Sequence, residues 1–63
     1  MYEGGSFSAG QIVTIYQDPA LQRVEKGRAE LMFKVSESHF FEVWRVKFLE
    51  NKKEEVCPIL KPL

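Results

Sequence analysis

The chain of 63 residues contains one histidine, His39, and that residue is the first place to look for catalytic chemistry. Ser36 and Ser38 stand close to it, and a serine hydroxyl next to an imidazole can serve as a nucleophile with its base. A working pair also needs an acid that orients the imidazole and donors that bind an oxyanion, and this polar stretch supplies neither. Because serine-rich segments are typical of turns, we expect His39 to lie in a turn without a catalytic role.

Cys57 is the only cysteine, which excludes an internal disulfide and, with a single histidine, the ligand set of a zinc site. It precedes Pro58 without a helix N-terminus that would lower the pKa of its thiol, so we expect a buried or half-buried apolar side chain. The adjacent Glu54 and Glu55 point to opposite faces of an extended strand and share no site. The sequence thus predicts a protein that is not an enzyme and that uses no metal and no cofactor.

Three aromatic residues could form a platform for a ligand. Trp44 lies in a run of inward positions, so core packing is its expected role, with a binding platform as the alternative. Tyr16 and Phe40 fall at the ends of expected strands, where aromatic side chains can line a shallow groove or cage beside a long loop. Tyr16 and Phe40 are therefore the candidate groove residues.

Length and charge narrow the class of protein further. A chain of about 60 residues removes only roughly 60% of its unfolded surface from water, so we expect one marginally stable domain that oligomerisation can stabilise. Nine Lys and Arg residues balance nine Asp and Glu residues and are interleaved with them, which disfavours strong phosphate binding. The beginning, MYEGGSFSAG, resembles neither a signal peptide nor a membrane span, so we expect a cytoplasmic protein without membrane contact.

We expect a flexible N-terminal tail over residues 1–9, which hold two glycines and two serines, and a single domain over residues 10–63. The segment GQIVTIY, residues 10–16, is rich in β-branched and aromatic residues and predicts the first strand. Residues 18–27, DPALQRVEKG, form either a long loop or a short helix with Asp18 as N-cap and Gly27 as its end. A helix of two turns with a thin apolar stripe is marginal, which favours the loop.

Residues 28–35 and 42–49 alternate between apolar and polar side chains, which predicts an antiparallel hairpin around a polar turn at residues 36–39. In one register of this hairpin, every inward residue of one strand lies opposite an apolar inward residue of the other. The inner pairs are Ala29–Phe48, Leu31–Val46 and Phe33–Trp44, and the outer pairs are Glu30–Lys47 and Met32–Arg45.

A polar loop after Glu50 leads into the last expected strand, EEVCPILKPL. With Val56 opposite Phe48, Pro58 would lie near Val46 and Leu60 near Trp44. Since proline has no N–H to donate, this strand must be a sheet edge or carry a bulge. The expected core contains Val13, Ile15, Ala29, Leu31, Phe33, Val35, Trp44, Val46, Phe48 and Val56.

The middle hairpin predicts a second apolar surface that points away from this core. Its residues are Met32, Phe41, Val43 and Leu49. Another segment of the chain could cover it, or it could bind a partner, since apolar groups ringed by charge are typical of interfaces. We therefore expect a non-catalytic protein-interaction module that binds a protein partner or itself, as a homo-oligomer. The alternative is a small barrel that binds nucleic acid weakly through Arg28, Lys34, Arg45 and Lys47.

One strand, a long loop and a three-stranded meander resemble a small SH3-like barrel. The segment IYQDP, residues 15–19, is similar to the aromatic and acidic segment that begins the specificity-determining loop of signalling SH3 domains. GQIVTIYQDP at 10–19 and WRVKFL at 44–49 also resemble segments of short SH3-like proteins from bacterial mobile elements and phages. The resemblance implies an all-β open barrel of four or five antiparallel strands with a long loop after the first strand, and it implies no biochemical role.

Overall fold

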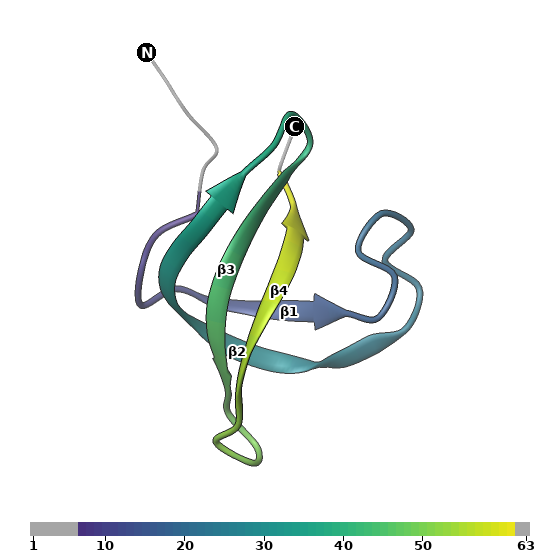
Figure 1. Cartoon of the computed structure of the whole chain (residues 1–63). Helices are drawn as coiled ribbons and strands as arrows, with labels where there is room; N and C mark the ends of the chain where they lie inside the picture. The colour runs from purple at the N-terminus through teal and green to yellow at the C-terminus, as the bar shows by residue number, and fades with distance from the viewer. Residues whose placement is uncertain (1–6, 62–63) are drawn as a thin grey trace.

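The computed structural model describes residues 7–61, which form an all-β structure without a helix (Figure 1). The strands are β1 (Ile12–Tyr16), β2 (Glu25–Glu37), β3 (Phe41–Phe48) and β4 (Glu54–Leu60). They form one four-stranded antiparallel sheet in the order β1-β2-β3-β4, so each strand pairs with its neighbour in sequence. The all-β prediction is confirmed, and Pro58 lies in an edge strand, as its missing N–H requires.

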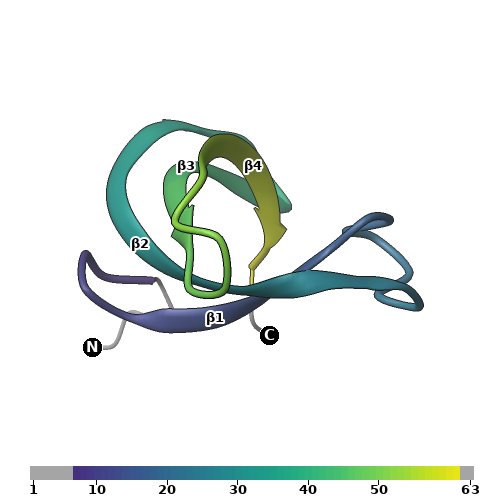
Figure 2. The same ribbon diagram turned by 90° about the horizontal axis from the view of Figure 1, so that it is seen from below.

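β2 connects the two halves of the sheet because, at 13 residues, it is long enough to pair with two different strands. Residues 25–30 pair with β1 and residues 29–37 pair with β3, so Ala29 and Glu30 lie between both neighbours. The sheet bends along β2, so β1 and the first part of β2 lie on one side of the molecule and β3 and β4 on the other (Figure 2). The inward side chains of these two layers make the core.

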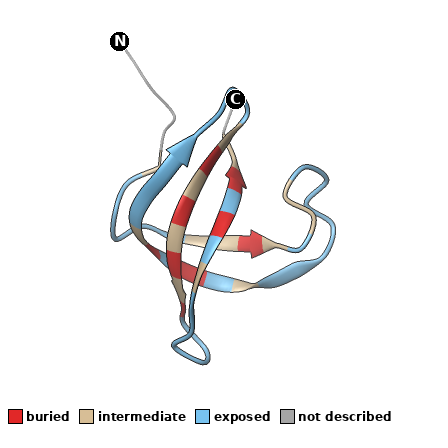
Figure 3. Cartoon of the chain, in the orientation of Figure 1, coloured by how far each residue is buried: buried red, intermediate tan, exposed pale blue. Residues whose placement is uncertain are grey.

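Alternation along the strands decides which residues enter the core. On β3, the even-numbered residues are buried and the odd-numbered residues are partly exposed (Figure 3). The buried apolar residues are Ile15, Ala29, Leu31, Trp44, Val46, Phe48, Cys57 and Ile59. Val13, expected in the core, is partly buried and packs against this cluster together with Phe7. Phe7 belongs to the expected tail at 1–9, of which residues 1–6 lie outside the described residues.

The expected β2–β3 register is confirmed in one half of the hairpin and wrong in the other. Ala29–Phe48, Glu30–Lys47 and Leu31–Val46 pair as expected. Irregularities between Leu31 and Phe33 and between Lys34 and Ser36 then place Arg45 opposite Phe33 and Trp44 opposite Lys34. Each bulge adds a residue to β2 alone and changes the face of the residues that follow. Phe33 and Val35, expected in the core, are therefore 54% and 51% exposed.

The expected β3–β4 register is also wrong, because the connecting loop is shorter than the sequence suggests. The N–H of Phe48 donates to the carbonyl of Lys53 at 2.8 Å and the N–H of Lys52 donates to the carbonyl of Phe48 at 2.9 Å, which closes a loop of residues 49–52. Lys52 adopts a positive φ of 64° in this turn. Val56 consequently lies opposite Arg45 instead of Phe48, at 50% exposure and outside the core. Pro58 lies opposite Val43 and Leu60 opposite Phe41, and the inward positions of β4 belong to Cys57 and Ile59.

Residues 17–24 form a loop and not a helix, as favoured above. Asp18 organises the loop, because one carboxylate oxygen accepts the N–H of Arg23 at 3.0 Å and of Val24 at 3.1 Å. Gly27 lies inside β2, so it ends no helix. Its φ of +149°, which residues with a Cβ rarely adopt, explains the need for glycine.

Candidate interaction surface

The odd-numbered residues of β3 point away from the core and collect apolar neighbours from β2 and β4. Residues directly opposite each other in antiparallel strands share a face. Phe33 and Val56 therefore flank Arg45 in one row, Pro58 lies beside Val43 in the next, and Leu60 lies beside Phe41. We call this set the outer face: Phe33, Phe41, Val43, Val56, Pro58 and Leu60.

The outer face combines large exposed apolar groups with one ion pair. Phe33 and Val56 each keep about half of their surface exposed, and Pro58 is exposed as well. Between Phe33 and Val56, the Arg45 guanidinium Nε lies 3.2 Å from a carboxylate oxygen of Glu54. Both charged side chains are about two-fifths exposed, so their pairing contributes little stability and remains open to exchange with another partner.

Only two of the four contact residues expected from the sequence lie on the same face of the sheet. Phe41 and Val43 lie on the outer face as expected, but Leu49 follows β3 at its far end and Met32 falls at the first bulge of β2. The residues that sequence reasoning missed are Phe33, Val56, Pro58 and Leu60. The alternation of apolar and polar residues in the sequence includes these four positions. The two bulges of β2 and the length of the 49–52 loop determine on which side of the sheet each of them lies.

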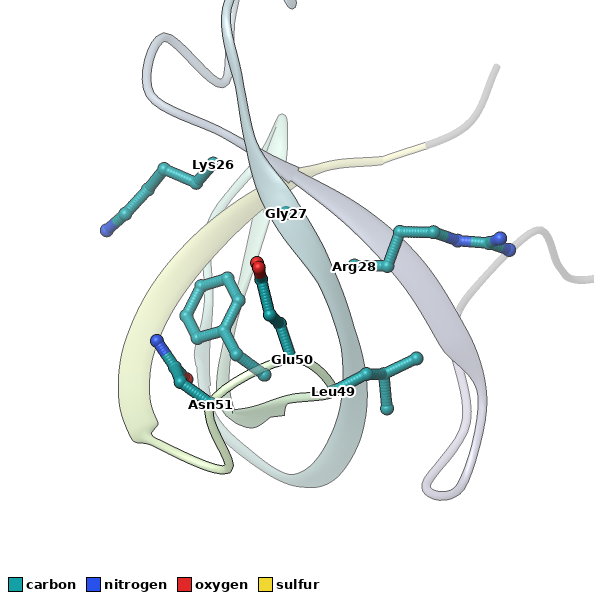
Figure 4. Close-up of a pocket in the computed structure, with 7 residues that line it drawn as sticks. Lys26, Gly27, Arg28, Leu49, Glu50 and Asn51 are labelled. Carbon is teal, nitrogen blue, oxygen red and sulfur yellow. The ribbon is translucent and has the colours of Figure 1, made fainter.

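Leu49 lines a hollow of about 380 Å³ where β2 passes the β3–β4 loop (Figure 4). Lys26 and Arg28 point away from it on opposite sides, and Glu50 points across the opening (Figure 4). The Lys26 ammonium lies 5.8 Å from the centre of the Phe48 ring and 2.8 Å from a Glu55 oxygen. The bond to Glu55 raises the pKa of Lys26 and lowers that of Glu55, so both are charged at neutral pH.

The two candidate groove residues lie in different places. Tyr16 lines a hollow of about 400 Å³ between the 17–24 loop and β4, together with Pro19, Val56 and Pro58. Phe40 lies in the β2–β3 turn, where it is largely exposed and contacts His39 edge-to-face at 4.5 Å between ring centres. Tyr16 thus lines a groove without Phe40.

The four candidate nucleic-acid residues do not form a free basic stripe. The Lys34 ammonium lies 2.7 Å from Glu37, and Arg45 pairs with Glu54. Lys47 stands between Glu30 and Glu54 in the ladder. Arg28 is the one of the four without an acidic neighbour in these pairings.

Of the groups considered for catalysis, Ser38 hydrogen-bonds within its turn and Cys57 is buried. The Ser38 hydroxyl donates to the carbonyl of Phe41 at 3.3 Å within the turn that holds His39. Cys57 is buried, as expected, and burial raises the pKa of its thiol, which opposes thiolate chemistry. Residues 7–61 contain no cluster of three or more His, Cys, Asp or Glu side chains that could hold a metal ion.

Glu42 is a buried polar group that the sequence did not single out. It lies between Trp44 and the β2–β3 turn on the inner face of β3, without measurable exposure. One carboxylate oxygen accepts the indole N–H of Trp44 at 2.8 Å, while no described residue hydrogen-bonds the other oxygen. Trp44 is thereby fixed in the core, which confirms the core role over the ligand platform.

Comparison with known proteins identifies no relative of this chain. No protein-family model, curated protein or solved structure matches the chain. Within residues 7–61, no helix is long and apolar enough to cross a membrane.

Proposed function

We propose that this chain is a small SH3-like barrel that acts as a non-catalytic protein-interaction module and associates with itself through the outer face. The observation that supports the proposal is the pair of half-exposed side chains, Phe33 and Val56, in one row of a face that Val43, Pro58 and Leu60 extend. Apolar side chains gathered on one face and accompanied by charge are typical of interfaces.

A second copy is a suitable partner because the outer face is self-complementary in charge. Arg45 and Glu54 stand near each other on this face. Two copies related by a two-fold axis can therefore place Arg45 of one near Glu54 of the other while their apolar groups meet. The chain has no net charge, so its copies do not repel one another.

Sedimentation at micromolar concentration tests this proposal with one pair of matched variants. Val56→Glu places a carboxylate in the centre of the outer face, and we expect an association constant at least about tenfold lower than that of the wild type. Arg45 lies opposite Val56 and can donate hydrogen bonds to the new carboxylate, so we expect the variant to stay folded. Val24→Glu makes the same change at a half-exposed position in the 17–24 loop, and we expect it to associate like the wild type.

A wild-type protein that sediments like the Val56→Glu variant at every concentration would refute self-association through the outer face. Equal weakening by Val56→Glu and Val24→Glu would also refute it, because added charge alone would then explain the effect. Fluorescence of Trp44, which is buried in the core, reports whether each variant is folded.

Nucleic-acid binding has less support, because Lys34 and Arg45 already pair with carboxylates and Lys47 faces two more. Binding that weakens steeply with added salt would be its signature.

A further inference from the structure

The second half of β2 contains two more residues than the part of β3 that it pairs with. Met32 and Val35 fall between the paired residues and form the two bulges. In this bulged register, Phe33 and Val35 are about half exposed, and Glu37 lies directly opposite Glu42. Apolar side chains in water and like charges in opposite positions both destabilise a sheet. The bulged register is therefore unfavourable for several of the side chains that it places.

A second register without the two bulges would continue the pairing that residues 29–31 make with β3. In this regular register, Phe33 would lie opposite Trp44 on the inner face, and Val35 would point inward as well. The position opposite Trp44 is held by Lys34 in the structure, and the Lys34 side chain is 41% exposed. This end of the inner face is therefore open enough to receive an apolar side chain.

The turn between β2 and β3 does not determine which register forms. The N–H of Ser38 donates to the carbonyl of Phe41 at 2.8 Å, so the loop consists of His39 and Phe40. In the regular register the loop would consist of Ser38 and His39, which is equally short. Hairpin loops of two residues prefer turns with a positive φ, and neither His39 nor Phe40 adopts one. The turn therefore gives the bulged register no special advantage.

Exposed ion pairs stabilise the bulged register. Glu37 binds both Lys34 and Lys61. Lys34 and Glu37 share a face because the bulge at Val35 lies between them, whereas residues three apart in a regular strand lie on opposite faces. The regular register would therefore break the pair of Lys34 with Glu37. Since exposed ion pairs contribute little stability, they hold this segment in the bulged register only weakly.

We propose that residues 32–37 of β2 form a two-register switch. The bulged register presents Phe33 on the outer face, and the regular register withdraws it to the inner face over Trp44. The change is confined to one end of the hairpin, because β1 pairs only with residues 25–30 and the β3–β4 pairs do not involve β2. A partner on the outer face selects the bulged register, since only that register offers it Phe33.

Two variants that differ by one position in the turn test this proposal. Asn-Gly is the strongest sequence signal for a hairpin loop of two residues. Ser38→Asn with His39→Gly, the 38–39 variant, moves the loop to the position that the regular register requires. His39→Asn with Phe40→Gly, the 39–40 variant, keeps the loop where the bulged register has it and is the matched control.

NMR identifies the register of each variant from the backbone contacts of Phe33 across the hairpin. We expect Phe33 to lie opposite Trp44 in the 38–39 variant and opposite Arg45, as in the structure, in the 39–40 variant. Phe33 opposite Arg45 in both variants would overturn the proposal, because the rest of the fold would then fix the bulges.

Relaxation dispersion of the wild-type protein decides the question if either variant does not fold. We expect exchange between two states on the microsecond-to-millisecond timescale at the amides of residues 32–37 and not at those of residues 29–31. Dispersion profiles that are flat over both ranges would overturn the proposal.

Sedimentation of the two variants separates the switch from the proposed function, because only the effect of the switch on association depends on that function. We expect the association constant of the 38–39 variant to be at least about tenfold lower than that of the 39–40 variant, since Phe33 leaves the outer face. Equal association with a changed register would refute the role of Phe33 in the outer face and support the switch. An unchanged register would refute the switch and leave the outer face as proposed.

Discussion

Glu42 shows how one residue in the core can hold another in place. Its carboxylate gives the indole N–H of Trp44 an acceptor where water cannot reach, and an unpaired buried donor would destabilise the fold. The neighbouring Lys34 ammonium responds to this carboxylate, since the charge of Glu42 contributes to the raised pKa of Lys34 after the larger effect of Glu37. Glu42 thus combines a specific hydrogen bond with a buried acid.

We expect Glu42→Ala to lower the free energy of unfolding by about 2 kcal/mol or more, because it removes the acceptor and leaves a cavity. Glu42→Gln keeps an acceptor for Trp44 without a carboxylate to bury, so it should stay within about 1 kcal/mol of the wild type. Urea unfolding followed by Trp44 fluorescence measures both. A Gln variant as unstable as the Ala variant would mean that the second carboxylate oxygen is needed as well.

The sequence predicts Trp44 in the core from alternation alone, and alternation also directs Glu42 inward. The charge of the Glu42 side chain, however, predicts an exposed position. Only the hydrogen bond to the Trp44 indole, seen in the structure, explains why Glu42 is buried. Cys57 also shows what the sequence alone leaves open. Its apolar character predicts that it is buried, but its neighbours in the core depend on the β3–β4 register.

At the scale of the elements, the 17–24 loop keeps its shape through Asp18. The N–H of Val24, and to a smaller extent that of Arg23, hydrogen-bonds the carboxylate and lowers the pKa of Asp18. The carbonyl of the same residue accepts from Gln22 at 2.7 Å and Leu21 at 3.1 Å. One residue therefore organises the turn that leads into β2.

We expect Asp18→Ala to raise the exchange rates of the Arg23 and Val24 amides at least about tenfold, because both lose their acceptor. Asp18→Asn keeps a side-chain oxygen in the same place and is the matched control. Exchange rates that respond equally in both variants would show that charge, and not the acceptor geometry, holds the loop.

Sequence reasoning finds the four strands and the loop because alternation and turn residues are local signals. It misses the register beyond Leu31 because Met32, Phe33, Lys34 and Val35 fit either face of a strand, so nothing in the alternation marks the bulges. It misses the β3–β4 register because residues 49–53 are compatible with several loop lengths. Both errors move apolar residues from the expected core to the outer face.

At the scale of the whole molecule, an ion pair joins the ends of two strands that are not neighbours in the sheet, β2 and β4. Lys61, which follows β4, binds Glu37 at the end of β2, and Glu37 also binds Lys34. Hydrogen bonds from Lys34 and then Lys61 lower the pKa of Glu37 from 4.5 to about 2. The three groups connect the last part of the described chain to the β2–β3 turn.

Because its pKa is lower in the folded state, Glu37 adds stability that is complete above about pH 4.5 and is lost as the pH falls toward about 2. We expect Glu37→Gln to be less stable than the wild type at pH 7 and equally stable near pH 2. The effect should be modest, since the pairs are exposed, and it should weaken with salt. Urea midpoints of both proteins across this pH range measure it, and a difference that persists at pH 2 would contradict it.

The shared strand β2 has a consequence for how the molecule comes apart. β2 pairs with β1 in one layer and with β3 in the other. If one layer unfolds, the other therefore loses the side chains that it packs against in the core. A protease cut in the middle of β2 would separate two fragments that each lack half of a core, so the chain behaves as a single cooperative unit in spite of its two layers.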